Sequence, residues 1–181
     1  MNKRQFFSLV GAFLALALPC RAADSIFLDL KIGTVKYEGT SRVRGFEKRI
    51  ECGSLQQSIA APGPGTVRPN ARAEARAEGG VTLNLTKIHD GNSPQLIQAF
   101  LEGLAIEGKF SFVKTNQDRA DEYYTIDGKR GRVTDIGMAA GGGGAPNESI
   151  TITFSEVTWT SIPLDDKGKP LGKPVVYSYK K

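Results

Sequence analysis

Apolar and polar residues alternate along most of this chain, and this pattern restricts its fold more than any other feature. In ESITITFSEVTWTS, residues 148–161, the side chains of Ile150, Ile152 and Phe154 fall on one face of an extended chain, with hydroxyl-bearing residues between them. A period of two predicts a half-buried strand. Past Glu156 the apolar residues change phase, which predicts a bulge that bends the strand.

The same kind of pattern predicts strands elsewhere. They cover 25–39, 49–62, 81–88, 109–114, 122–126 and 131–136, with a short final strand in the tail. A chain of 181 residues is most simply one domain with a sizeable core. The pattern therefore predicts a mainly β fold, a small antiparallel β-barrel or sandwich with its strand edges hidden.

One segment, NSPQLIQAFLEGLAIEG at 92–108, follows the period of an α-helix instead. We expect Ser93 to be its N-cap and Pro94 to occupy the first helical position, where the missing N–H costs nothing. The apolar residues of the segment form a single stripe that we expect to pack on the sheet. The stripe consists of Leu96, Ile97, Phe100, Leu101 and Leu104.

The first residues resemble an export signal. Lys3 and Arg4 precede an apolar run at 6–18, and small residues follow at the position that a signal peptidase reads. We predict a signal peptide at 1–22, cleavage between Ala22 and Ala23, and a folded domain at 23–181. The apolar run is too short for a confident membrane span, so no membrane insertion is expected once the leader is removed.

The charge of the chain excludes some partners. The formal net charge is +5, but Lys3, Arg4 and Arg21 belong to the leader and contribute three of these charges, which leaves +2. This is too weak to predict binding to nucleic acid or to a membrane surface. Cys52 becomes the only cysteine after cleavage, and we interpret it as a small buried apolar residue.

Residues with reactive side chains do not form a recognisable catalytic pattern. His89, Asp90 and Ser93 invite comparison with a hydrolase triad, but triad members converge from separate elements, and these are close neighbours in sequence. We interpret His89 and Asp90 as residues at the start of the helix. The glycines at 141–144 lack the Lys-Ser/Thr ending of a phosphate loop and precede a strand, so they predict a connector. We expect no catalytic activity, no cofactor and no metal.

Four segments together resemble the haemolysin-coregulated protein (Hcp) family. They are TKIHDGNSPQLIQAFLEG, EYYTI with RVTDI, NESITITFSEVTWTSIPLDDKGKPLG, and IECGSLQQSIAAP. The resemblance implies a small β-barrel with a flanking helix that forms hexameric rings. These rings stack into the injection tube of a bacterial type VI secretion system, whose lumen carries effectors and whose partners are spike and sheath proteins.

The resemblance also assigns residues. It implies that Gln56 faces the lumen, at a position where the family usually has serine. It implies that the segment 62–80, with Arg68, Arg72, Glu74 and Arg76, is an extended arm that reaches a neighbouring subunit or ring. It further implies one long strand through TIDGKRGRV, although Asp127-Gly128 alone would predict a hairpin. We therefore predict a strand interrupted by a bulge or a short loop near Gly128 to Gly131.

The leader sets this chain apart from the family, because tube subunits assemble in the cytoplasm and normally lack one. Two functions therefore remain open. The chain could be a tube subunit, assembled in the cytoplasm if translation starts downstream of the leader. The alternative is an exported Hcp-like binding or adhesion protein that is periplasmic or secreted.

Overall fold

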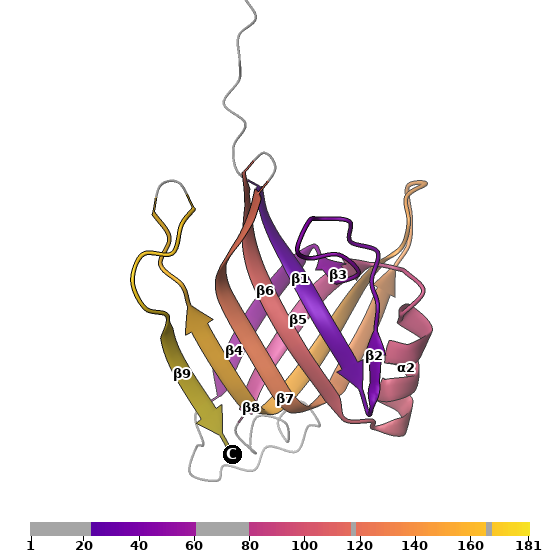
Figure 1. Ribbon diagram of the computed structural model, residues 1–181. Helices are drawn as coiled ribbons and strands as arrows, with labels where there is room; N and C mark the ends of the chain where they lie inside the picture. Colours follow the sequence, from indigo (N-terminus) through magenta and orange to yellow (C-terminus); the bar gives the residue numbers. More distant parts are fainter. Residues whose placement is uncertain (1–22, 61–79, 117–118, 166–167) are drawn as a thin grey trace, which may run out of the picture.

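The computed structural model describes residues 23–60, 80–116, 119–165 and 168–181, and these form an antiparallel sheet with one helix at its side (Figure 1). The expected mainly β fold with one flanking helix is confirmed. The strands are β1 (Ala23–Ile32), β2 (Val35–Tyr37), β3 (Ile50–Cys52), β4 (Ser54–Ala60), β5 (Gly80–Ile88), β6 (Ile106–Asn116), β7 (Arg119–Ala139), β8 (Asn147–Ser161) and β9 (Val175–Lys180), and the helix is α2 (Ser93–Glu102).

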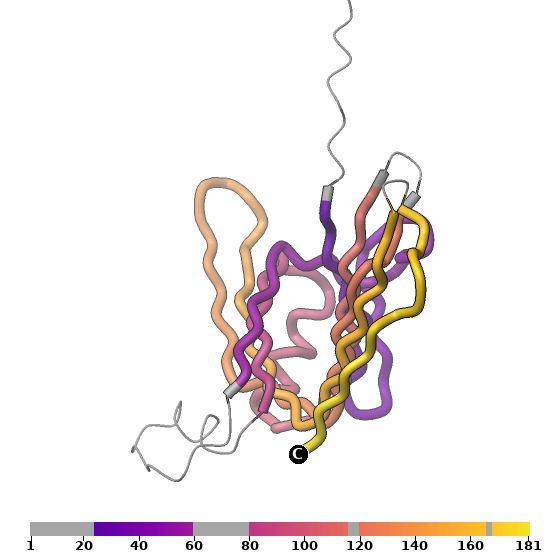
Figure 2. The backbone as a smooth tube through the Cα atoms, turned by 90° about the vertical axis from the view of Figure 1, so that its left-hand side faces the viewer, coloured from indigo at the N-terminus to yellow at the C-terminus, as the bar shows by residue number. Residues whose placement is uncertain are grey.

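The sheet is strongly curved, and its two ends approach each other. The strand order is β2-β1-β6-β7-β8-β5-β4, with β3 paired to β1 and β9 paired to β8. In the side view of Figure 2 the strands form two walls that face each other and meet at the lower end of the molecule. Among the described strands no continuous ladder closes the sheet, so it is a barrel only in a loose sense.

The predicted strand at 49–62 is divided in the structure. β3 pairs with β1 and β4 pairs with β5, and only Gly53 separates them. The N–H of Gly53 donates to the carbonyl oxygen of Thr86 at 2.7 Å. A Cβ at Gly53 would lie 3.2 Å from the Thr86 hydroxyl, so a glycine suits this close approach. The segment thereby links the two ends of the sheet.

The core forms where the alternating faces of the strands meet. On β5 the buried apolar side chains are Val81, Leu83 and Leu85, and on β8 they include Ile150 and Ile152. The register pairs Leu83 with Ile152 and Leu85 with Ile150, so both strands present one apolar face to the interior. A smaller cluster of Phe27, Phe46 and Val113 packs on the other face of β1 and β6.

β7 runs without a break through the predicted irregularity. Against β6, Ile106 pairs with Gly131 and Gly108 pairs with Gly128, so β7 has one more residue than β6 between these pairs. Arg130 lies in this bulge with φ of 50°. The predicted bulge between Gly128 and Gly131 is confirmed, and no hairpin forms.

The bulge also accounts for the change of phase in β8. The pairing of β7 with β8 keeps one register from Tyr124 opposite Ser161 to Gly131 opposite Phe154. β8 therefore follows the bend of β7 at the bulge. The buried side chains of β8 accordingly change from even-numbered positions up to Phe154 to the odd-numbered Val157. A Cβ at Gly131 would lie 2.5 Å from the Phe154 ring, which explains the absence of a side chain there.

Helix α2 differs from the prediction at its start and on its packed face. Its N-cap is Asn92 rather than Ser93, so Ser93 is the first helical residue and Pro94 the second, not the first as predicted. The Ser93 hydroxyl instead binds Lys87 and Glu148. The predicted stripe is wrong in part. Leu96 and Ala99 are buried, since the small side chain of Ala99 allows the helix to approach the sheet, and Leu104 is half-buried. The other stripe residues, Ile97, Phe100 and Leu101, are exposed.

Candidate functional site

The outer face of β4, β5 and β8 carries a continuous set of uncharged polar side chains, which we call the neutral face. The register places Gln56 opposite Asn84 and Asn84 opposite Thr151, so residues of the same phase on three strands share one face. On β5 and β8 they point away from the core, because the residues that alternate with them are buried. The neutral face consists of Ser54, Gln56, Ser58, Thr82, Asn84, Thr86, Ser149, Thr151 and Thr153.

Hydrogen bonds between strands satisfy much of the neutral face. The Asn84 amide donates to the Thr151 hydroxyl at 3.0 Å. The hydroxyls of Thr82 and Thr153 lie 3.1 Å apart, and those of Ser54 and Thr86 lie 2.8 Å apart. Because these groups bind one another and carry no charge, the face offers little attraction to ions or to charged peptide.

Gln56 is exposed on the neutral face, with its side chain on the opposite side of β4 from the half-buried Leu55. The Gln56 side chain therefore points to the outer face of β4, as expected for a lumen-facing residue. That this face lines the lumen of a ring stays a prediction. Arg68, Arg72, Glu74 and Arg76 of the predicted arm lie outside the described residues. Of the predicted cleavage residues, Ala22 also lies outside them, and Ala23 is the first residue of β1.

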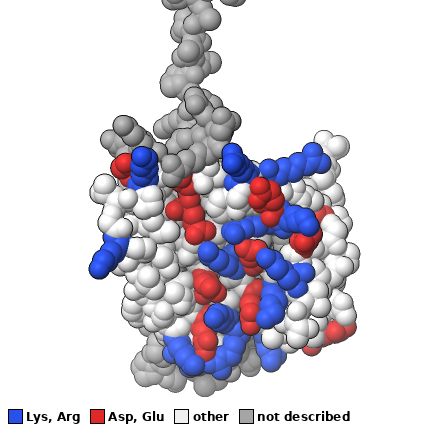
Figure 3. All heavy atoms as spheres, in the orientation of Figure 1, with Lys and Arg blue, Asp and Glu red and all other residues white. Residues whose placement is uncertain are grey.

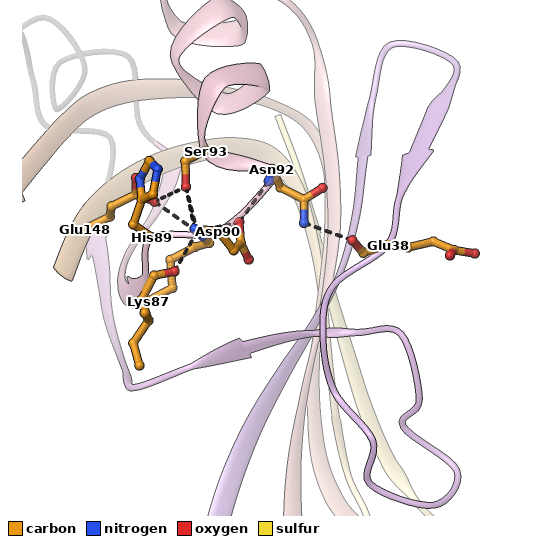
Figure 4. A network of polar contacts seen from close by, with 8 residues as sticks. Glu38, Lys87, His89, Asp90, Asn92, Ser93 and Glu148 are labelled. Atoms are coloured by element: carbon orange, nitrogen blue, oxygen red, sulfur yellow. Dashed lines mark hydrogen bonds and ion pairs between the residues drawn. The ribbon is translucent and has the colours of Figure 1, made fainter. Parts of the chain in front are cut away.

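A second polar site lies inside the protein, where helix α2 meets β5 and β8 (Figure 4). Lys87 and Glu148 are register partners on β5 and β8. Their side chains are 1% and 4% exposed, and the Lys87 Nζ lies 2.9 Å from the Glu148 Oε2. Strand pairing thus brings two opposite charges together inside the fold. We call these residues and their side-chain partners Asp90, His89 and Ser93 the buried ionic cluster.

The other members of the cluster come from the start of the helix. The Lys87 Nζ also contacts the Asp90 Oδ1 at 2.9 Å and donates to the Ser93 Oγ at 3.1 Å. The Ser93 hydroxyl donates to the Glu148 Oε2 at 2.8 Å, and the His89 Nδ1 lies 2.7 Å from the Glu148 Oε1. The cluster therefore fastens the beginning of α2 to two strands.

The electrostatics of the cluster favour a charged Glu148. Burial alone raises the pKa of this carboxyl, but the hydrogen bonds from Lys87, His89 and Ser93, together with the positive charge of Lys87, lower it below its usual 4.5. Ser93 is 1% exposed and its hydroxyl donates to Glu148, so its geometry is not that of a nucleophile. The structure therefore brings His89, Asp90 and Ser93 together in contacts that hold the start of α2 against β5 and β8, not in a catalytic triad.

Sequence reasoning missed Lys87 and Glu148, although a signal for both was present. Lys87 has the same strand phase as Leu83 and Leu85, and Glu148 has the same phase as Ile150. A charged residue in the apolar phase of a strand needs a buried partner. Two such residues of opposite sign on two predicted strands indicate an internal ion pair.

Cys52 is half-buried against the core, close to the expected role. Burial raises the pKa of its thiol to about 12, so the thiol is a poor nucleophile and a poor metal ligand at neutral pH. Within the described residues, no group of three His, Cys, Asp or Glu side chains could hold a metal ion. No helix in the same part of the chain is both long and apolar enough to span a membrane.

The side of the molecule formed by β1, β2 and β6 differs from the neutral face. Positive and negative side chains alternate over it (Figure 3). Lys31 lies 3.2 Å from Glu107, and Lys36 lies 3.1 Å from Asp29. These charges are balanced locally, so this side attracts neither a polyanion nor a polycation.

Comparisons with known proteins agree with this fold. The Salmonella typhimurium protein Hcp1 has a TM-score of 0.64 at 20% identity, with 87% of this chain and 95% of that chain covered. Hcp1 of the E. coli EAEC 042 pathovar, in a doubly substituted form, has a TM-score of 0.64 at 20% identity, covering 86% and 98%. A type VI secretion system effector from Yersinia pestis has a TM-score of 0.63 at 18% identity, covering 86% and 99%.

A search of curated protein sequences finds no significant match. A protein-family model described as "Type VI secretion system effector, Hcp" matches residues 27–160, which is most of the described chain. This span includes all or most of every described strand except β9, and it contains the neutral face and the buried ionic cluster. The chain therefore belongs to the Hcp family of type VI secretion proteins.

Proposed function

We propose that this protein is a structural subunit of a type VI secretion tube, and that six copies form a ring with the neutral face toward the lumen. The observation that carries the proposal is the neutral face itself, which covers three neighbouring strands and carries no charge. A lumen that carries folded or unfolded cargo needs a hydrated polar surface that does not bind the cargo tightly. Paired hydroxyl and amide groups provide such a wall.

The unpaired edges of the sheet also support ring formation. β4 pairs only with β5, and β9 pairs only with β8, so each leaves one backbone edge without a strand partner in the described chain. Such edges favour association with further chains, and a closed ring uses them without open growth. The protein acts by assembly, and we expect no catalytic activity.

Further partners follow from the same function. Rings would stack on one another, and the segment with Arg68, Arg72, Glu74 and Arg76 would reach the adjacent subunit or ring. Cargo effectors would occupy the lumen, the spike would sit at the end of the tube, and the sheath would surround it. Gln56 is longer than the usual serine, so we expect its cargo preference to differ from that of relatives.

The leader at 1–22 supports a second candidate, a ring that is exported and acts as a binding or adhesion protein. N-terminal sequencing of the native protein, combined with cell fractionation, separates the two. A mature N-terminus at Ala23 in the periplasm or medium supports export. An intact apolar run on cytoplasmic protein supports assembly of the tube in the cytoplasm.

Light scattering tests the ring directly. The protein should have about six times the mass of one chain. Gln56→Trp should narrow the central opening in electron micrographs and leave the mass unchanged, because a lumen-facing side chain packs against no neighbour. The matched control is Val35→Trp, which adds the same side chain at an exposed position on β2 and should leave the opening as it is. A stable monomer at micromolar concentration overturns the ring, and loss of the ring in Gln56→Trp alone places Gln56 in an interface.

A further inference from the structure

Two apolar surfaces of the chain have no partner within the described residues. The first is convex and lies on helix α2, where the exposed fractions are 43% for Ile97, 40% for Phe100 and 75% for Leu101. We call these three residues the helix ridge. They are the part of the predicted apolar stripe that does not pack on the sheet. An apolar helix face without a cover in the monomer indicates a contact with another chain.

The second surface is concave, with a volume of about 440 Å³. We call it the aromatic groove. Trp159 and Tyr177 stack along it with ring centroids 5.8 Å apart, and the Trp159 indole N–H donates to the Gln57 side-chain oxygen at 3.1 Å. These contacts fix the positions of the side chains that line the groove. It is lined by Gln57, Ile59, Tyr124, Trp159, Tyr177 and Tyr179.

The groove results from a fork in the sheet. β8 pairs with β5 up to Phe154 and with β9 from Glu156 onward, both on the same edge. The two neighbours diverge at Ser155, so β4 and β9 stand on opposite sides of the fork. Ile59 on β4 and Tyr177 on β9 remain 63% and 67% exposed. None of the described residues covers the core of the sheet at this place.

The two surfaces lie on opposite sides of the molecule, α2 on the right and β9 on the left in Figure 1. A chain with one convex and one concave apolar surface on opposite sides can associate head to tail, and head-to-tail contacts generate rings when the rotation closes. All residues of the helix ridge and all residues that line the groove are uncharged, so no buried charge opposes this pairing. An amphipathic helix in an apolar groove is a common mode of recognition.

We propose that the helix ridge of one copy occupies the aromatic groove of the next copy around the ring. The proposal depends on the proposed ring and identifies the surfaces that form it. Leu101 has the largest exposed fraction of the ridge and enters the groove, with Phe100 and Ile97 on either side.

Charge substitutions on the two surfaces test this contact. Leu101→Asp and Tyr177→Asp should each convert the six-fold mass measured by light scattering to that of a monomer at micromolar concentration. Both positions are strongly exposed, so circular dichroism and thermal unfolding of each variant should match those of a folded protein. Val35→Asp is the matched control, because Val35 is 53% exposed and lies on β2, outside both surfaces. It should keep the six-fold mass.

A rescue and a cross-link identify the partner surfaces. Combining Leu101→Asp with Tyr177→Lys should restore a measurable share of the ring by pairing opposite charges across the contact. With Cys20→Ser as background, Leu101→Cys together with Tyr177→Cys should give a ladder of cross-linked chains on a non-reducing gel, whereas Val35→Cys with Tyr177→Cys should not. Cys52→Ala is also part of the background, because this free thiol is only half-buried.

The outcomes separate this proposal from the proposed function. A wild-type ring that survives Leu101→Asp and Tyr177→Asp overturns the helix-in-groove contact and leaves the tube subunit intact. A wild-type monomer overturns both. Loss of the ring in Tyr177→Asp but not in Leu101→Asp also overturns the proposal, because another segment of the neighbouring chain, or another protein, then fills the groove.

Discussion

The buried ionic cluster and the ion pairs on the β1, β2 and β6 side use the same chemical groups in opposite surroundings. Lys87 and Glu148 lie 2.9 Å apart with side chains 1% and 4% exposed. Lys31 and Glu107 lie 3.2 Å apart with side chains 42% and 49% exposed. Both pairs join neighbouring strands. Geometry alone would rank the two contacts as nearly equal.

Burial makes them different. Around the exposed pair, water screens the charges and solvates each group that loses its partner, so the pair contributes about 0–1 kcal/mol. Inside the protein neither charge can be solvated, and removal of one partner costs about 3–5 kcal/mol. The buried cluster therefore determines where helix α2 begins, whereas the exposed pairs only balance charge on an outer surface.

The largest effect is expected from Lys87→Met. This substitution keeps the length and volume of the side chain but leaves Glu148 and Asp90 next to an apolar group in the interior. We expect the free energy of unfolding to fall by about 3–5 kcal/mol. Urea unfolding followed by circular dichroism measures this loss, and Lys31→Met is the matched control. A loss below about 1 kcal/mol would show that water reaches the cluster and that the contrast between the regions is false.

Strand phase explains how much of this contrast could be predicted from the sequence. The alternation of β5 and β8 follows from packing one face of each strand on the core, so both strands were located correctly. Lys87 and Glu148 belong to the buried phase of those strands, and their pairing follows once the register is known. The register depends on the way β8 joins β5, which is a contact between distant segments that local pattern does not determine.

The helix and the fork show the limit of local pattern. The stripe from Leu96 to Leu104 is wide enough to offer two faces, and the close approach of Ala99 to the sheet determines which face is buried. The aromatic groove depends on the change of partner strand at Ser155 of β8, from β5 to β9. No residue type at this position predicts that change of partner. Gln56 has the phase expected of the neutral face, but a lumen is formed by several chains and is not a property of one.

The second effect concerns pH and separates the buried carboxylate from an exposed one. The folded-state pKa of Glu148 is lowered, so its contribution to stability is present above the unfolded pKa, near 4.5, and is lost as the pH falls through the lower folded value. We expect Glu148→Gln to cost about 2 kcal/mol at pH 7, since hydrogen bonds to charged groups contribute about 1.5–3 kcal/mol. The difference from wild type should shrink below pH 4.5.

Glu156→Gln is the matched control for this titration. Hydrogen bonds from Arg130 and Lys180 lower the pKa of Glu156 as well, but this carboxylate lies at the surface. High salt should therefore remove the pH-dependent difference for Glu156→Gln and leave that for Glu148→Gln largely unchanged. Equal salt dependence of the two variants would contradict the assignment of Glu148 to a buried environment.

The smallest effect is expected on the exposed side. Lys31→Met and Glu107→Gln each remove one partner of a pair that is close to half exposed, and the remaining charge regains water. We expect each loss in the free energy of unfolding to stay below about 0.5 kcal/mol and to decrease further at high salt. A double-mutant cycle on urea unfolding isolates the coupling between the two side chains, because each single variant removes the interaction. A coupling above about 1 kcal/mol would mean that the ladder of charges on β1 and β6 acts as a network, and this side would then share the role of the buried cluster in fixing the fold.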